Sequence, residues 1–283
     1  MTSRPFRMID VVPSAVPQSG NRLAVVLDAE GLAAEQMAAF SAWTILSECT
    51  FVLPPTDPAA DYRVRIFSLT TELPFAGHPM LGTARAWLDA GGVPRTPGRV
   101  VQERGVGLVP ARSLDTETGD ETALAFAVPQ LIRSDPVADA DAVLVLEPDI
   151  TPRAGEQSIG VGAVFEGPEN DSADAAIEVP AFFNDAGGPL WEDPVTGILN
   201  ASVAKWLIGS GRVEAPYVGR QGARVSRDGR VQMTEADGEL WIGGTAVVPV
   251  SGVVWAYESE CRSPEQGIVD LDEVGMPPLR WSQ

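Results

Sequence analysis

The chain has 283 residues, 45% of them hydrophobic and 21% charged, a composition typical of a globular protein and not of a disordered or fibrous one. This length predicts two medium-sized domains or one large one. Acidic residues outnumber basic ones by 39 to 20, so the formal net charge is -19. Nucleic acid and anionic membrane are therefore not expected as partners, because most of the surface would repel a polyanion.

Several residue types are too scarce to build common catalytic centres. His78 is the single histidine, which excludes a three-histidine zinc site, and Lys205 is a lone lysine in an apolar segment, where no Schiff base is expected. Cys49 and Cys261 are too few and too far apart for a metal cluster. We therefore expect neither metal nor cofactor. Two thiols, and no apolar run suited to a signal peptide or membrane span, predict a cytoplasmic protein.

The first part of the chain predicts short strands and one exposed helix. Residues 33–44 carry Met37, Phe40 and Trp43 at helical spacing and predict an amphipathic helix. Unbroken or alternating apolar runs predict strands on either side of it, at residues 8–12, 23–27, 50–53 and 61–67.

Two similar segments predict two buried helices. Glu72–Pro79 leads into an apolar helix over about residues 79–90, and Glu192–Gly197 leads into another over about residues 197–209. A proline followed three residues later by glycine occurs in both segments, and each helix contains a Trp-Leu pair. This repetition indicates one architectural unit used twice.

The remaining apolar runs complete an α+β fold of two similar domains. Each domain is expected to be a curved, mostly antiparallel sheet wrapped around one buried central helix. The boundary is expected in the proline-containing stretch 129–136, which gives domains 1–128 and 134–283. The extreme C-terminus, 276–281, is expected to cover the first domain or to pack on a partner. Further strands are predicted at 124–128, 142–146, 159–165, 224–233, 240–242 and 246–254.

Two helix starts offer unpaired N–H groups and positive dipole ends, which bind a carboxylate without lysine or arginine. If the two halves face each other, both starts point into one cleft, with His78 and Asp193 on either side of a bound acid. Taken singly, Asp193 is more simply a helix N-cap and His78 a polar turn residue. Their matching positions in a repeated unit favour a site.

Glu48 is a third candidate. Its apolar neighbours Trp43, Ile45, Leu46 and Phe51 predict partial desolvation, which would raise its pKa towards a value useful for proton transfer. The alternative is an exposed glutamate at the edge of a strand.

Several motifs follow one another in a specific order and spacing: Gly20-Asn21, 46–52, 72–79, 192–197, Arg220-Gln-Gly, Asp228-Gly and Gly243-Gly244. With these motifs the chain resembles the PhzF-type phenazine-biosynthesis-like proteins from about residue 8 to about residue 254. The resemblance implies the diaminopimelate epimerase fold, with the active site between two domains, usually in a dimer without a cofactor. The best-known members of the family isomerise trans-2,3-dihydro-3-hydroxyanthranilic acid by moving a proton between ring carbons.

Carried over residue by residue, the resemblance places the family's catalytic glutamate on Glu48, its histidine on His78 and its aspartate on Asp193. Glu48 is then expected to take and return the proton. His78, Asp193 and the backbone N–H groups of Gly77 and Gly197 are expected to hold the carboxylate and amine of a small-molecule substrate.

Asn21 and Ile198 complete the expected substrate-binding residues. Ile198 stands where the family usually has serine, so the pocket is expected to be more apolar and to take a different or bulkier substrate. Two alternatives stay open: a binding protein without turnover, and an epimerase that uses Glu48 and Asp193 as opposed bases. A racemase with two thiols is excluded, because Cys49 and Cys261 lie away from the helix starts.

Overall fold

The computed structural model describes residues 2–114, 123–127, 158–160, 165–166, 175–184, 190–236 and 238–256. Helices α1 (Ala34–Thr44), α2 (Gly77–Asp89) and α3 (Gly197–Gly209) and the short 3-10 helix η1 (Ala223–Val225) lie among these residues. The first eight strands are β1 (Thr2–Val11), β2 (Asn21–Val26), β3 (Glu48–Leu53), β4 (Tyr62–Ser68), β5 (Thr71–Leu73), β6 (Arg99–Arg104), β7 (Gly107–Ser113) and β8 (Ala123–Ala127).

The second half contributes shorter strands and one long one. They are β9 (Ser158–Gly160), β10 (Phe165–Glu166), β11 (Ile177–Glu178), β12 (Ala181–Asn184), β13 (Leu190–Asp193), β14 (Tyr217–Gln221), β15 (Gly229–Ala236) and β16 (Glu239–Ala256). Of the described strands, β9, β12 and β13 form one small sheet, and the other 13 form a single large sheet. The long β16 pairs with β1, β8 and β15, so it joins strands from both ends of the chain in one hydrogen-bonded surface.

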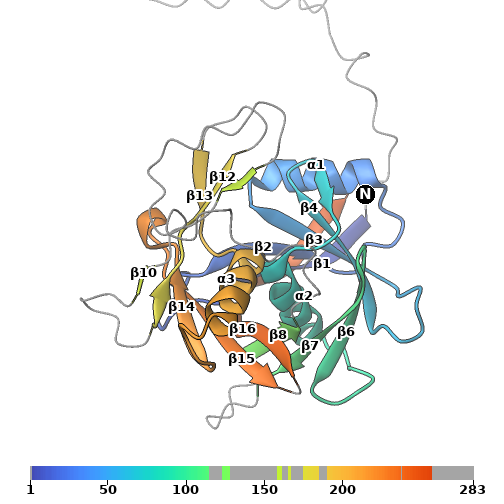
Figure 1. Cartoon of the computed structure of the whole chain (residues 1–283). Coiled ribbons are helices and arrows are strands. Elements are labelled where there is room, and N and C mark those ends of the chain that lie inside the picture. The colour runs from blue at the N-terminus through green and yellow to red at the C-terminus, as the bar shows by residue number, and fades with distance from the viewer. Residues whose placement is uncertain are drawn as a thin grey trace, which may run out of the picture.

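Helix α2 lies inside this large sheet. It packs against β1, β2, β3, β7, β8 and β16, while α3 packs against β15 and β16. Figure 1 shows α2 and α3 at the centre, surrounded by strands, with α1 across the outside. Nearly the whole first half of α2 is buried because its residues are apolar or small on every side, as the sequence predicts. Thr83 fits there because its hydroxyl donates to the Pro79 carbonyl at 2.6 Å and lies 2.9 Å from the Thr50 hydroxyl, at hydrogen-bonding distance.

Helix α1 agrees with the sequence prediction in position but not in all of its contacts. Met37 is fully buried, and the Phe40 ring meets the Phe51 ring edge-on at 5.9 Å between centroids. Trp43, however, is 79% exposed. The buried residues of this short helix are Met37 and the small Ser41, so the buried side of the helix does not include Trp43. The expectation that Trp43 faces the core is wrong.

The predicted strand 224–233 is wrong in its first half. Residues 223–225 form η1, and Gly222 and Ser226 adopt left-handed backbone conformations that an extended strand does not contain. The predicted strands 240–242 and 246–254 are parts of β16. Residues 142–146, 129–136 and 276–281 lie outside the described residues, and the division into two similar domains stays a prediction.

Candidate active site

The starts of α2 and α3 meet backbone to backbone. A Cβ atom added to Gly77 would lie 2.6 Å from the Gly197 Cα, and one added to Gly197 would lie 2.7 Å from the Gly77 Cα. No side chain fits between the two turns, which explains glycine at both first helical positions. The positive ends of both helices are therefore concentrated at one point, the arrangement that favours a bound anion.

Asn21, at the start of β2, connects the two helix starts. Its side-chain nitrogen donates to Asp193 Oδ1 at 3.0 Å and to the Val195 carbonyl at 3.0 Å, and it lies 3.4 Å from His78 Nδ1. All of these groups are buried. Asn21 thus ties residues before α3 to the first turn of α2.

His78 and Glu48 face each other across the start of β3. Glu48 Oε2 lies 3.4 Å from His78 Nε2, and both atoms are buried without a hydrogen-bond partner among the described residues. His78 Nδ1 lies 3.4 Å from the Asn21 amide nitrogen, whose two hydrogens are directed at Asp193 and the Val195 carbonyl. The parallel pairing of Leu23 with Glu48 brings the glutamate to the same end of the sheet as Asn21.

Burial sets the protonation behaviour of this cluster. It raises the pKa of Glu48 well above 4.5, and the nearby carboxyl of Asp193 raises it further. Burial also raises the pKa of Asp193 to about 7, although hydrogen bonds from Thr196, Asn21 and Ser47 oppose the rise. Burial lowers the pKa of His78 to about 3, so the imidazole is neutral near neutral pH. Trp43 and Ile45 do not cause the burial of Glu48, since both are largely exposed.

A second group of polar side chains holds Asp193 and the start of α3. The Thr196 hydroxyl donates to Asp193 Oδ2 at 2.6 Å, and Gln221 Nε2 donates to the Asp193 carbonyl at 3.1 Å. Gln221 Oε1 accepts from Asn200 Nδ2 at 2.7 Å and from the Thr196 backbone N–H at 3.0 Å. Asp193 itself is therefore fixed by hydrogen bonds, whereas Glu48 Oε2 is not.

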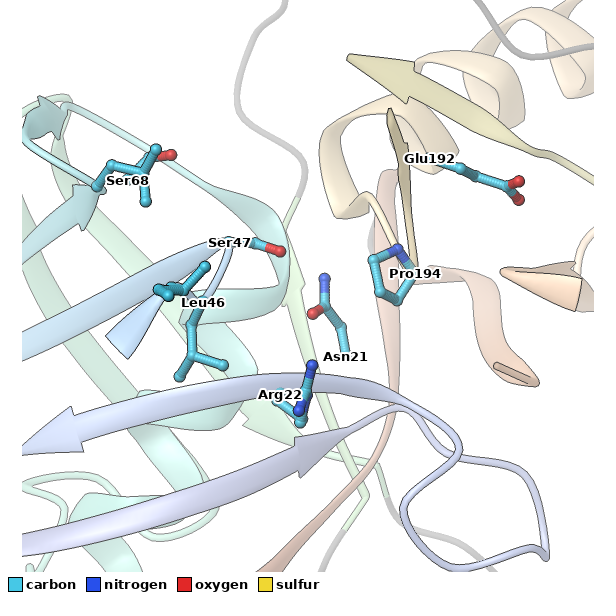
Figure 2. Close-up of a pocket in the computed structure, with 9 residues that line it drawn as sticks. Asn21, Arg22, Leu46, Ser47, Ser68, Glu192 and Pro194 are labelled. Carbon is cyan, nitrogen blue, oxygen red and sulfur yellow. The ribbon is translucent and has the colours of Figure 1, made fainter. Parts of the chain in front are cut away.

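A cavity of about 330 Å³ opens beside this cluster. Figure 2 shows Leu46, Ser47 and Ser68 on one side of it, Pro194 and Glu192 on the other, and Asn21 and Arg22 between them. Ser47 and Glu192 directly precede Glu48 and Asp193 in the chain, and the Ser47 hydroxyl lies 3.4 Å from Asp193 Oδ1. The cavity thus reaches the edge of the buried cluster, at the small end of the usual size range for ligand pockets, about 300 to 1,000 Å³.

The structure brings all the predicted site residues to one place. Glu48, His78, Asn21 and Asp193 lie in one chain of contacts, and Gly77 and Gly197 touch beside it. Ile198 is half-buried in the first turn of α3, with its backbone nitrogen 3.0 Å from the position of a Cβ on Gly77.

Sequence reasoning missed the supporting polar residues and the wall of the cavity. The Thr196 hydroxyl could have been found from its position three residues after Asp193. Gln221 and Ser47 stand inside the motifs 220–222 and 46–52, but those motifs indicated no role for them. Arg22 carries no such local signal, because strand pairing brings it here.

Within the residues that the structure describes, no three histidine, cysteine or acidic side chains are grouped as metal ligands. None of the helices formed by the described residues is both long and apolar enough to span a membrane.

A buried carboxyl and a neutral imidazole lie beside two meeting helix starts. Comparison with known proteins identifies its family. The family model described as "Phenazine biosynthesis-like protein" (PhzC-PhzF) matches residues 12–144. A Deinococcus radiodurans protein named "Uncharacterized isomerase" is 30% identical over 283 aligned positions, which cover 84% of this chain and 87% of the relative. The chain belongs to the PhzF-type phenazine-biosynthesis-like family, which confirms the resemblance.

Other similarities cover less of the relative or concern the fold alone. The Pseudomonas aeruginosa trans-2,3-dihydro-3-hydroxyanthranilate isomerase is 40% identical over 124 residues, which are 44% of this chain and 42% of that enzyme. The chain thus matches less than half the length of that curated relative. A solved PhzF-family structure from Enterococcus faecalis has a TM-score of 0.66 at 19% identity and covers 90% of this chain and 100% of its own. The α+β fold is therefore of the PhzF type.

Proposed function

We propose that this protein is a cofactor-independent isomerase that moves a proton between two carbons of a small, carboxylate-bearing, unsaturated substrate. The observation that carries the proposal is the pair of unpartnered buried atoms, Glu48 Oε2 and His78 Nε2, 3.4 Å apart beside the meeting helix starts. The names of the relatives, which include isomerases, support the same reaction class. Two similar domains, a homodimer and a cytoplasmic location belong to the same proposal.

In this mechanism Glu48 does the proton transfer. A carboxylate with a raised pKa is a stronger base than an ordinary one, so ionised Glu48 removes a proton from a substrate carbon. The electrons delocalise over the adjacent double bond, and the now neutral Glu48, whose carboxyl proton exchanges with solvent, delivers a proton to the carbon at the far end. No proton is gained or lost overall, and no oxidant is needed.

The other residues position the reacting groups. His78 lies against Glu48 and limits its position, and the backbone N–H groups at Gly77 and Gly197 bind the substrate carboxylate, where both helix dipoles are positive. Asp193 holds the substrate amine. Ile198 adds an apolar surface next to these groups. Bound in this way, the substrate is held close to Glu48 in one orientation, which supplies much of the rate enhancement.

The hydrogen bonds favour a single base over two opposed bases. Asp193 accepts from Asn21, Thr196 and Ser47, and an acceptor held in this way moves less freely than Glu48. An epimerase with Glu48 and Asp193 on opposite faces of a stereocentre is therefore the less supported alternative. Chiral chromatography of the product separates the two, because only the epimerase inverts a stereocentre without moving a double bond.

The test is exchange of substrate hydrogen with solvent. Trans-2,3-dihydro-3-hydroxyanthranilate and related cyclic unsaturated amino acids are incubated in heavy water, and deuterium incorporation is followed by NMR. Wild-type protein should incorporate deuterium, and Glu48→Gln should not. Glu72→Gln is the matched control, because Glu72 is an exposed glutamate paired with Arg65 at 2.6 Å. Exchange that survives in Glu48→Gln contradicts the proposal, and carboxylate binding without exchange in wild type indicates a binding protein.

A further inference from the structure

Arg22 is the exposed residue of an otherwise buried strand, and it lines the cavity. In β2, the residue before it is the buried Asn21 and the residues after it are buried too. Among the described residues Arg22 has no ion pair or hydrogen-bond partner for its side chain. The start of β2 therefore presents the Asn21 amide to the buried cluster and the Arg22 guanidinium to the cavity (Figure 2).

Two acidic residues lie near Arg22 in the fold, and neither forms an ion pair with it within the described part of the chain. Asp10 is its cross-strand neighbour, and the Asp10 carboxylate accepts from the Gly20 N–H at 2.9 Å. Glu192 lines the same cavity as Arg22.

Several other arginines are paired with carboxylates. The ion-pair distances are 2.7 Å for Arg7 with Asp89, 2.6 Å for Arg65 with Glu72 and 2.9 Å for Arg220 with Asp228. The net charge of the chain is -19, so the electrostatic potential over most of the surface is negative. An unpaired guanidinium beside the cavity makes the potential positive there. It attracts an anionic ligand to this cavity, although the acidic surface as a whole repels anions.

We propose that Arg22 binds a second anionic group of the substrate, so that the cleft selects small molecules carrying two anionic groups. This inference rests on the proposed function, in which the first carboxylate binds at the helix starts beside Gly77 and Gly197. A guanidinium presents a planar fork of donors that matches a carboxylate in two parallel hydrogen bonds. Because Asn21 and Arg22 both line the cavity, a ligand that fills it reaches the buried cluster and the guanidinium together.

The test compares two probes that differ by one carboxylate, 2-aminobenzoate and 2-aminoterephthalate, by isothermal titration calorimetry. Wild-type protein should bind the dicarboxylate about tenfold more tightly, the gain expected from one charge-assisted contact at a partly exposed site. Arg22→Gln should remove this preference and leave the affinity for 2-aminobenzoate unchanged. Arg22→Lys should keep part of it, because the charge remains without the fork. Arg99→Gln, at an exposed strand arginine outside the cavity, is the matched control and should behave as wild type.

Equal affinity of wild type for both probes, affinity for neither, or a preference that survives in Arg22→Gln would overturn the inference. Binding at equilibrium requires no turnover, so the result is independent of the heavy-water exchange that tests Glu48. Exchange that depends on Glu48, together with equal affinity for the two probes, would refute the role of Arg22 alone. Loss of exchange without loss of the dicarboxylate preference would refute the isomerase alone.

Discussion

Replacing Gly197 by alanine should force apart the two helix starts on which the site depends. The added Cβ would lie 2.7 Å from the Gly77 Cα and 2.9 Å from the Gly77 carbonyl carbon. Carbon atoms in contact prefer about 3.5 to 4.0 Å, so the first turn of α3 has to move by about 1 Å. The atoms in the way belong to backbone, which cannot rotate aside as a flexible side chain would.

The energetic consequence follows from this overlap. Overpacking in a close-packed interior lowers the free energy of unfolding by about 1 to 3 kcal/mol. Alanine in place of glycine returns up to about 1 kcal/mol by reducing the freedom of the unfolded chain. We therefore expect Gly197→Ala to lose about 1 to 2 kcal/mol in urea unfolding. A displacement of about 1 Å should also reduce turnover about a hundredfold, because the N–H groups no longer meet the substrate in the productive orientation.

Gly209→Ala is the matched control on the same helix. Nothing lies within 4 Å of a Cβ added there, at the last residue of α3. This variant should be as stable as wild type or more stable by up to about 1 kcal/mol. If Gly197→Ala unfolds at the same urea concentration as wild type, the helix starts are not in the close contact described above, and the steric reasoning is refuted.

Two further predictions concern buried polar groups. The folded state favours protonated Asp193, so the stability contributed by this group is fully present below its ordinary pKa of 3.8 and is lost as pH rises through about 7. The difference in unfolding free energy between wild type and Asp193→Asn should therefore fall across that range in urea titrations, and a difference independent of pH would contradict the assignment. Tyr62 is 2% exposed and, among the described residues, its hydroxyl has no hydrogen-bond partner. Tyr62→Phe should raise the unfolding free energy by about 1 kcal/mol, since an unsatisfied buried hydroxyl is removed, and a clear loss of stability would reveal a partner for that hydroxyl.

Local patterns predicted the parts of the fold that depend on near neighbours. Apolar residues around the whole circumference of 77–89 can only be buried, and a proline and glycines at the ends mark where such a helix stops. For the same reason the repeated motif before 197–209 predicted a second helix of the same kind. These signals are contained in a few consecutive residues, so no tertiary contact is needed to read them.

Local patterns failed where the environment of a side chain comes from distant segments. Trp43 was expected in the core from its spacing, yet it is 79% exposed. Glu48 was expected to be desolvated by its chain neighbours. Its burial comes instead from the pairing of β3 with β2 and from the contact with His78. The expected direction of its pKa was right, but for a reason that the sequence did not contain.

The amino-acid sequence by itself therefore determined the family, the two buried helices and the residue types available for proton transfer, because each is written in short, ordered motifs. Only the tertiary structure decided that Gly77 touches Gly197, that Asn21 reaches both His78 and Asp193, and that Arg22 lines the cavity without an ion-pair partner among the described residues. The physical reason is that these contacts join residues up to 172 positions apart. Their geometry depends on strand register and on the packing of the whole sheet, which no local pattern specifies.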